Sequence, residues 1–515
     1  MMRTNSEPNS IEPRLFDLPN VLGHNDWSLS DAAELEAQHL LATAQHRLAL
    51  FEAETPPNLA GNAEMRRAVL TEKAQLYRTA IAPHRKLPNE ILTEIFFAAS
   101  GKVTVPVANI DTEPPWTLFR VCKRWREIAS TTPKLWTHIR LFYEGKRQDD
   151  RWLKMSKTVL ARSEGKPMTL RITRERSHRT RHTPLAKVFR EIVITNAHRL
   201  QEFRIDASGQ ELIDIFNMAS PEWASLRHLV LRCSTKNMAP SGIVRVFENA
   251  PHLHTLKSYL KMFSGFGYHF PWAHITKLDM PYSKLHPYAA LEILRQCPNI
   301  ETCLLSFSDD MIYSSHNHIP STNSPRENQP PITLPALKLL DVNIYKCSNF
   351  ILFLGPLVLP QLTTLSIDGE TVMVPDPWNP EYIPIIARFE RLEKISLNIS
   401  VPSVDIDALI KQITPLLTEF SIPRGDVLSI STLSSIASGE LLPNLKKLHC
   451  MITDDTPGAH LDMVERRETI EASFQCTNSE ATFRREGGEY EVRFKALEES
   501  GRLSCYSGHW RKAGG

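Results

Sequence analysis

A six-residue word, apolar-x-x-apolar-x-apolar, returns at near-constant spacing between residues 200 and 450 of this 515-residue chain. Its nine full copies are Leu200/Phe203/Ile205, Leu226/Leu229/Leu231, Ile275/Leu278/Met280, Ile300/Cys303/Leu305, Leu337/Leu340/Val342, Leu362/Leu365/Ile367, Leu392/Ile395/Leu397, Leu417/Phe420/Ile422 and Leu445/Leu448/Cys450. Leu253/Leu256 keeps two of the three positions. A fixed period of this kind indicates stacked supersecondary units, so we expect a repeat array.

Successive words start 26, 27, 22, 25, 37, 25, 30, 25 and 28 residues apart. The 37-residue interval contains a segment rich in Ser, Asn and Pro, from Ser306 to Pro331, which we interpret as a loop. Proline precedes the first apolar position by two residues in five repeats, at Pro251, Pro298, Pro335, Pro360 and Pro443. Because proline cannot continue a helix and favours extended neighbours, each unit is predicted to run helix, stop, short strand.

This period and word are similar to those of leucine-rich repeats, which run roughly 20–29 residues. We therefore predict an α/β solenoid over residues 199–455 with a parallel sheet on its concave face. The word's apolar residues would form the core. The residue between its second and third apolar positions would point out of the sheet and could bind a target protein. These residues are Arg204, Val230, Asp279, Leu304, Asp341, Ser366, Ser396, Ser421 and His449, with Lys257 from the incomplete word.

A second dense pattern precedes the array. Leu87-Pro88-Asn89-Glu90-Ile91-Leu92-Thr93-Glu94-Ile95-Phe96 predicts a helix, with Pro88 in its first turn and Gly101 at its end. A second helix is predicted from Trp116 to Ala129, and Trp136 to Phe142 alternates like a strand. The apolar stripe of the second helix is Leu118, Val121, Cys122, Trp125, Ile128 and Ala129.

These residues resemble the F-box family, and most closely the F-box-like proteins common in fungi. The resemblance covers residues 84–142 and is carried by Leu87-Pro88-x-Glu90-Ile91-Leu92-x-x-Ile95-Phe96, by Val121-Cys122-Lys123-x-Trp125 and by Leu135-Trp136. His84-Arg85-Lys86-Leu87-Pro88 matches the junction that often precedes the module in that family. The segment from Ala98 to Pro115 departs from the family, because it is longer than in a minimal F-box and lacks the usual central leucines.

The resemblance implies a non-enzymatic adaptor of a Skp-cullin-F-box ubiquitin ligase in the cytoplasm or nucleus. The F-box would bind a Skp-family adaptor and, through it, a cullin, while the repeats would hold an unknown target protein. The residues implied in adaptor binding are Leu87, Pro88, Ile91, Leu92, Ile95, Phe96, Leu118, Val121, Cys122, Trp125 and Trp136. Many of them would also hold the module's own core. The longer 98–115 segment favours an alternative, a scaffold that keeps the fold but works without cullin.

The remaining segments complete a small helical N-terminal module followed by the solenoid. We expect disorder over 1–27, a helical hairpin or short coiled coil over 28–83, and a basic connection with irregular first repeats over 143–198. A cap and tail are expected over 456–515, with a helix from Leu461 to Ile470, strands over 482–485 and 490–494, and fraying from 501.

A basic run contains Arg171, Arg174, Arg176, Arg179 and Arg181, opposed only by Glu175. It allows a third function, a nucleic-acid-associated scaffold. We favour a solvated loop and helix rim, because no aromatic residues interleave within the run.

Composition agrees with a soluble adaptor. Hydrophobic residues make up 42% and charged residues 23% of the chain, and the formal net charge is +2. The eight cysteines have no zinc-ligand spacing, and we interpret them as reduced thiols. No catalytic motif is present, and we expect no cofactor, no metal, including at His316 and His318, and no membrane partner. The most apolar run, Phe350 to Leu359, is about half the length that spans a bilayer.

Overall fold

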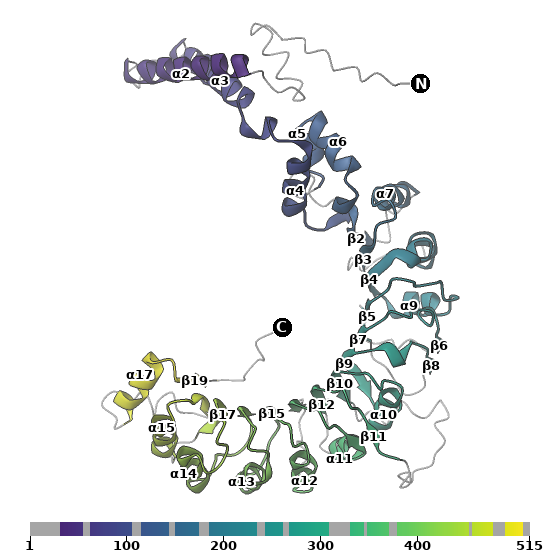
Figure 1. Cartoon of the computed structure of the whole chain (residues 1–515), viewed down its shortest axis with the longest axis vertical. Coiled ribbons are helices and arrows are strands. Elements are labelled where there is room, and N and C mark those ends of the chain that lie inside the picture. Colours follow the sequence, from purple (N-terminus) through teal and green to yellow (C-terminus); the bar gives the residue numbers. More distant parts are fainter. Residues whose placement is uncertain are drawn as a thin grey trace. The chain divides into compact units, whose positions relative to one another are not determined.

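The computed structural model describes residues 31–54, 62–105, 115–143, 150–174, 185–233, 243–260, 267–307, 330–344, 348–369, 378–452, 456–476 and 490–507. The chain divides into two compact units, Met1–Thr180 and Arg181–Gly515 (Figure 1). The disorder expected over 1–27, the strand expected over 482–485, and His316 and His318 lie outside the described residues. So do residues 106–114 of the long segment.

The first unit begins with an antiparallel pair of helices, α2 (Asp31–Glu54) and α3 (Asn62–Ala80). An ion pair of 2.8 Å between Arg67 Nη2 and Glu52 Oε1 joins them. Alanines at positions 37, 44 and 74 are buried, and their small side chains let the two helices approach closely.

The rest of the first unit alternates helices with three parallel strands. Its elements are η2 (Pro83–Arg85), α4 (Asn89–Ala99), β1 (Val103–Val105), α5 (Leu118–Val121), α6 (Lys123–Thr131), η3 (Pro133–Trp136), β2 (His138–Tyr143), α7 (Asp150–Ala161) and β3 (Met168–Arg174). The strands lie in the order β1-β2-β3, with Val103 opposite Ile139 and Ile139 opposite Leu170.

Two expectations about this unit were wrong in detail. The continuous helix predicted from Trp116 to Ala129 is broken at Cys122, whose extended backbone has φ −161° and ψ 173°. The break places Cys122 Sγ as the N-cap of α6, where it accepts a hydrogen bond from the Trp125 amide at 3.4 Å. Trp136 belongs to η3 and precedes the strand that was predicted to start there.

The second unit is a long parallel sheet with helices on one side of its strands (Figure 1). Its sheet has the order β4 (Leu200–Ala207), β5 (His228–Cys233), β7 (Thr255–Tyr259), β9 (Lys277–Leu285), β10 (Thr302–Phe307), β12 (Leu339–Ile344), β14 (Thr364–Gly369), β15 (Lys394–Asn398), β16 (Glu419–Ile422), β17 (Lys447–Ile452), β18 (Glu471–Cys476) and β19 (Leu503–Ser507). Two further parallel pairs join β6 (Ile243–Val244) to β8 (Gly267–Tyr268) and β11 (Ile332–Thr333) to β13 (Leu357–Val358).

Helical segments connect the strands. They are α8 (Leu185–Val188), η4 (Phe189–Ile194), η5 (Ala197–Arg199), α9 (Gly209–Phe216), η6 (Trp272–His274), α10 (Pro287–Arg295), α11 (Ser348–Leu354), α12 (Tyr382–Ala387), α13 (Ser403–Gln412), α14 (Ile430–Ser438), α15 (Pro457–Arg466) and α17 (Glu491–Glu499). Local sequence explains their ends. Ser208 and Glu211 form a capping box at α9. Gly439 ends α14 at φ 79°, a conformation that favours glycine.

The second and third apolar positions of each repeat word lie in one strand, and they share one register across the sheet. Leu340 lies between Cys303 and Leu365, and Phe420 lies between Ile395 and Leu448. All of these side chains are buried. Because alternate residues of a strand face opposite sides, one register places the words in a single core between sheet and helices.

Parallel strands also occur outside the 199–455 range that the sequence predicted for the array. Parallel strands β2 and β3 already occur before residue 199, and Arg171 and Arg174 lie in β3 where a loop or helix rim was favoured. Strands β18 and β19 continue the sheet after residue 455, where a cap and tail were expected, and residues 503–507, expected to fray, form a strand. The segment predicted as a strand at 490–494 begins α17 instead, with Phe494 buried. Arg176, Arg179 and Arg181 lie outside the described residues.

Candidate functional site

The apolar residues predicted for adaptor binding in segment 84–142 fall into three classes of exposure. Leu92, Phe96, Leu118 and Trp136 are buried. Leu87, Cys122 and Trp125 are half-buried, and Pro88 is exposed. Ile91, Ile95 and Val121 are 47%, 44% and 44% exposed, respectively. The predicted adaptor-binding set therefore mixes the module's core with residues that are accessible to a partner.

Aromatic rings build the core of this module. The Phe96 and Trp125 rings lie 4.7 Å apart between centroids, and Trp116 meets Trp136 edge-on at 5.5 Å. Trp136 Nε1 donates to the Ala129 carbonyl at 2.8 Å. The packing of these rings, together with the hydrogen bond of the Trp136 indole N–H, fixes α6 against α4 and η3.

Arg124 holds the start of α4. Its guanidinium donates to the carbonyls of Arg85 at 3.0 Å and Leu87 at 2.5 Å, and Arg124 Nε donates to Asn89 Oδ1 at 3.0 Å. The side chain thus joins α6 to the turn that enters α4, and so sets the position of Ile91 and Ile95 on that helix.

Phe97 is a further exposed apolar residue that the sequence pattern did not select. It is 46% exposed, and the Lys134 ammonium lies 5.9 Å from its ring centroid. Helical spacing could have identified Phe97 as exposed. It follows the buried Phe96 directly, and consecutive residues of a helix do not share a face.

The second candidate site is the face of the parallel sheet opposite the buried words, here called the open face. The ladder pairs Arg204, Val230, Lys257, Asp279, Leu304, Asp341, Ser366, Ser396, Ser421 and His449 in one continuous row across neighbouring strands. Ser473 and Ser504 extend the row on β18 and β19. The sequence prediction did not include these two serines. They could have been found from Ala472-x-Phe474 and Leu503-x-Cys505, each of which keeps the last two apolar positions of the repeat word.

The row changes character along the sheet. From β4 to β12 it mixes charged residues with the aliphatic Val230 and Leu304, and the Lys257 ammonium pairs with Asp279 at 3.0 Å. From β14 to β19 it carries serine hydroxyls and His449, with Ser473 Oγ and Ser504 Oγ 2.8 Å apart. Val230, Asp279, Ser366 and Ser421 are buried, and the other predicted members are half-buried.

The Ser421 hydroxyl lies 3.4 Å from His449 Nδ1, and burial lowers the pKa of His449. That separation is longer than the about 2.6–3.2 Å expected of a nucleophile and its base. We assign this pair to the polar lining of the open face.

The buried thiols of Cys297 and Cys303 are expected to be unreactive. Burial raises the pKa of Cys297 to about 12, and it raises the pKa of Cys303 well above its ordinary value. Such thiols carry little thiolate and pack as small hydrophobes. Within the described ranges, no group of three or more His, Cys, Asp or Glu residues could hold a metal ion.

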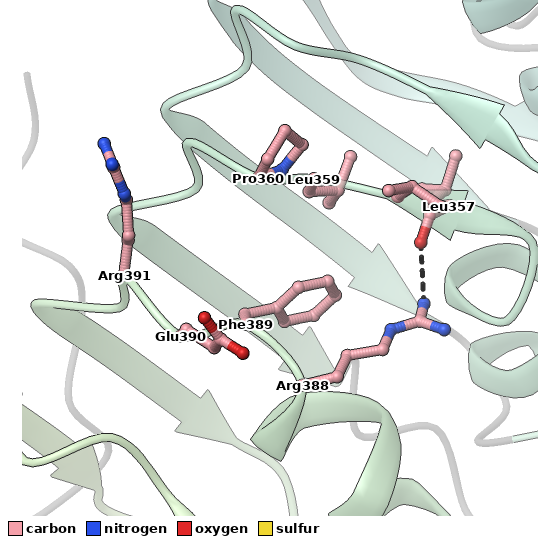
Figure 2. Close-up of a pocket in the computed structure, with 8 residues that line it drawn as sticks. Leu357, Leu359, Pro360, Arg388, Phe389, Glu390 and Arg391 are labelled. Carbon is pink, nitrogen blue, oxygen red and sulfur yellow. Dashed lines mark hydrogen bonds between the residues drawn. The ribbon is translucent and has the colours of Figure 1, made fainter.

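A surface pocket of about 300 Å³ lies where two neighbouring repeats meet (Figure 2). Leu357, Leu359, Arg388 and Phe389 help to line it, and the Arg388 guanidinium reaches the Leu357 carbonyl at 2.9 Å. Arg388 also donates to the carbonyls of Leu354 and, at 3.0 Å, Gly355. The Arg388 guanidinium therefore already binds carbonyls at and just beyond the end of α11. For this reason we interpret the pocket as the junction between neighbouring strand–helix units and not as a ligand site.

Comparison with known proteins does not assign a family. No protein-family model matches the chain, and no curated protein matches it. The helices in the described part of the chain are all too short or too polar to cross a membrane.

Proposed function

We propose that this protein is the substrate-recognition adaptor of a Skp-cullin-F-box ubiquitin ligase. The F-box-like module over residues 84–142 binds a Skp-family adaptor, and a leucine-rich-repeat solenoid holds the target. The protein performs no bond chemistry in this scheme. It raises the concentration of the target near the ubiquitin-conjugating enzyme.

One observation carries the proposal: among the described residues of this segment, large apolar side chains lie at the surface while others on the same helix are buried. Ile91 and Ile95 are one helical turn apart on α4, so they share a face. Both are nearly half exposed, while Leu92 and Phe96 on the same helix are buried. An apolar helix face supported by a packed core is the kind of surface that a partner protein covers.

The open face supports the second half of the proposal. Its row of charged, hydroxyl and aliphatic side chains is held in register by the sheet, and the repeat words supply the core behind it. A long preorganised surface with mixed chemistry suits a protein ligand, because little conformational entropy is lost when it binds.

The test is capture of a Skp-family adaptor and cullin by the full-length chain, compared with an Ile91→Asp, Ile95→Asp variant. We expect both proteins with the normal chain and neither with the variant, because two carboxylates would be buried without partners at the contact. Ile430→Asp is the matched control, since Ile430 is an exposed isoleucine of α14 in the second unit. It should capture both proteins normally.

Failure of the normal, folded chain to capture either protein would refute the ligase assignment. It would favour the cullin-independent scaffold that the long 98–115 segment suggests. A nucleic-acid role for Arg171 and Arg174 would require binding to generic RNA or DNA that weakens steeply with salt. We do not favour that role, since Arg171 and Arg174 lie within β3 and Arg171 Nε donates to Thr173 Oγ1 at 3.2 Å.

A further inference from the structure

Three large side chains lie close together on neighbouring strands of the open face, near the carboxyl ends of those strands. The Arg232 guanidinium on β5 lies 4.6 Å from the centroid of the Tyr259 ring on β7. The Tyr259 ring lies 5.9 Å from the Tyr282 ring on β9. Arg232 and Tyr259 are direct partners in the ladder, one alternate position beyond Val230 and Lys257. We call these three residues the aromatic cluster.

A bulge in β9 places Tyr282 in the cluster. The ladder pairs Met280 with Leu305 and Leu285 with Phe307, so β9 carries extra residues between these two pairs. The buried Ser283 hydroxyl lies 2.9 Å from the Met280 carbonyl and 3.1 Å from the Ser306 carbonyl, which ties the bulge to β10. Bulges of this kind redirect a side chain and often occur next to functional sites.

The cluster is ordered but open to solvent. Tyr282 is 62% exposed, although the Tyr259 ring lies on one side of it and Arg232 in turn lies over Tyr259. Tyrosine and arginine are the residue types that most often dominate binding energy at protein interfaces. Rings held by their neighbours lose little conformational entropy on binding.

We propose that the aromatic cluster anchors the target protein through a segment that presents a carboxylate beside an apolar side chain. The guanidinium of Arg232 would pair with the carboxylate, and the rings of Tyr259 and Tyr282 would cover the apolar side chain. This inference rests on the proposed function, because it assigns the target-holding role to one part of the open face.

The charge of the aromatic cluster favours an acidic side chain of the target over a phosphorylated one. A phosphate carries close to two charges and is bound best by several converging cations. Lys257, in the adjacent row, is paired with Asp279 at 3.0 Å. The cluster offers one guanidinium, and Asp206 lies opposite Arg232 in the ladder, so a doubly charged phosphate is disfavoured and the single charge of a carboxylate is the better match.

The experiment selects random peptides displayed on phage against the purified full-length chain, after depletion on a Tyr282→Ala variant. We expect the selected sequences to share an Asp or Glu next to an apolar residue. Synthetic peptides from the selection should bind the Tyr282→Ala variant about tenfold or more weakly by fluorescence anisotropy. Tyr288→Ala is the matched control, because Tyr288 on α10 is 44% exposed and stacks on His286 outside the cluster.

A double-mutant cycle tests the carboxylate contact. Changing the peptide's acid to its amide should weaken binding to the normal chain and have little effect on an Arg232→Gln variant. Selected peptides without an acid, preference for a phosphorylated peptide over the acidic one, or equal effects of Tyr282→Ala and Tyr288→Ala would each overturn the proposal. So would the recovery of no peptide that prefers the normal chain.

Adaptor capture on the same preparations separates this inference from the proposed function. A chain that captures the Skp-family adaptor but selects no acidic peptide loses only the inference. A chain that selects the acidic peptides but captures no adaptor loses the ligase assignment and keeps the cluster as a binding site.

Discussion

Ile91 and Leu92 are adjacent on α4 and have opposite environments. Leu92 is 1% exposed and packs in the core of the first unit, whereas Ile91 faces solvent. The sequence pattern placed both in one adaptor-binding set, because the family resemblance does not distinguish a residue that supports the surface from one that forms it.

A pair of alanine substitutions should separate these two roles. Leu92→Ala should lower the free energy of unfolding by about 2–5 kcal/mol, because it removes buried methyl groups and leaves a cavity. Ile91→Ala should change stability by only about 0.5 kcal/mol, as expected of a surface site. Urea denaturation of both variants checks this, and similar losses would show that Ile91 belongs to the core.

His460 on α15 is a second residue whose environment departs from its usual one. The side chain is fully buried against Phe474, with ring centroids 5.1 Å apart, and its Nδ1 lies 2.8 Å from the Thr456 carbonyl. Burial lowers the pKa of His460 to about 4, and the hydrogen bond to Thr456 opposes this shift only in part. The imidazole is therefore neutral in the folded chain at neutral pH.

This pKa predicts a loss of stability in acid. The unfolded chain binds a proton near pH 6.5 and the folded chain only near pH 4, so the contribution of His460 is complete above about pH 6.5 and is lost as pH falls toward 4. The loss should be about 3 kcal/mol at most. A His460→Gln variant should lose less stability than the normal chain between pH 7.5 and 4.5, and equal losses would contradict the assignment. His198→Gln, at an exposed histidine, is the control.

At the scale of elements, arginines donate to carbonyls at and just beyond the ends of two helices. Arg467 donates to the Ile436 carbonyl of α14 at 3.2 Å and to the Leu442 carbonyl beyond that helix at 2.9 Å, and Arg388 donates to the carbonyl of Leu354, the last residue of α11, and to that of Leu357 at 2.9 Å. The last carbonyls of a helix have no partner within the helix, so a cation from the following repeat satisfies them and opposes the negative end of the helix dipole.

Arg388→Ala should therefore destabilise the protein by about 1–2 kcal/mol, because the carbonyls of Leu354 and Leu357 lose a charged donor in a part-buried environment. Arg391→Ala is the comparison, since Arg391 also lines the pocket of Figure 2 but donates to the exposed side chain of Gln361 at 2.6 Å. It should have an effect of about 0.5 kcal/mol or less. Thermal or urea unfolding would decide, and a stable Arg388→Ala variant would leave the pocket open as a ligand site.

At the scale of the whole molecule, the second unit is stabilised by neighbouring repeats. Strand β16 pairs with β15 and β17, and its buried Phe420 lies in register with Ile395 and Leu448. In a stacked array, stability is roughly the sum of the repeats and of the interfaces between neighbours. Loss of one large core residue should be felt most by the adjacent repeats.

Phe420→Ala should cost about 3–5 kcal/mol locally. In hydrogen exchange measured by mass spectrometry, the amides of β15, β16 and β17 should exchange faster, while those of β4 and β5 should change little. Uniformly faster exchange over the whole second unit would instead indicate a single cooperative core.

The repeat words were sufficient to predict the strands and the order of residues on the open face, because apolar periodicity is a local property of the chain. Local patterns predicted less well where tertiary contacts compete. Cys122 fits a helical stripe, yet it breaks the helix because its extended backbone lets Sγ cap α6. Tyr490 to Phe494 alternates like a strand, yet residues 491–499 form α17, in which Phe494 reaches the core.

The sequence by itself therefore determined the α/β class, the parallel strands and the row from Arg204 to His449, since each depends on which residues are apolar and how far apart they stand. The tertiary structure alone decided which apolar residues of the F-box-like segment are exposed, and it brought Arg232, Tyr259 and Tyr282 together. The physical reason is distance along the chain. Burial and ring contacts arise between segments tens of residues apart, and only the register of the sheet brings such segments into contact.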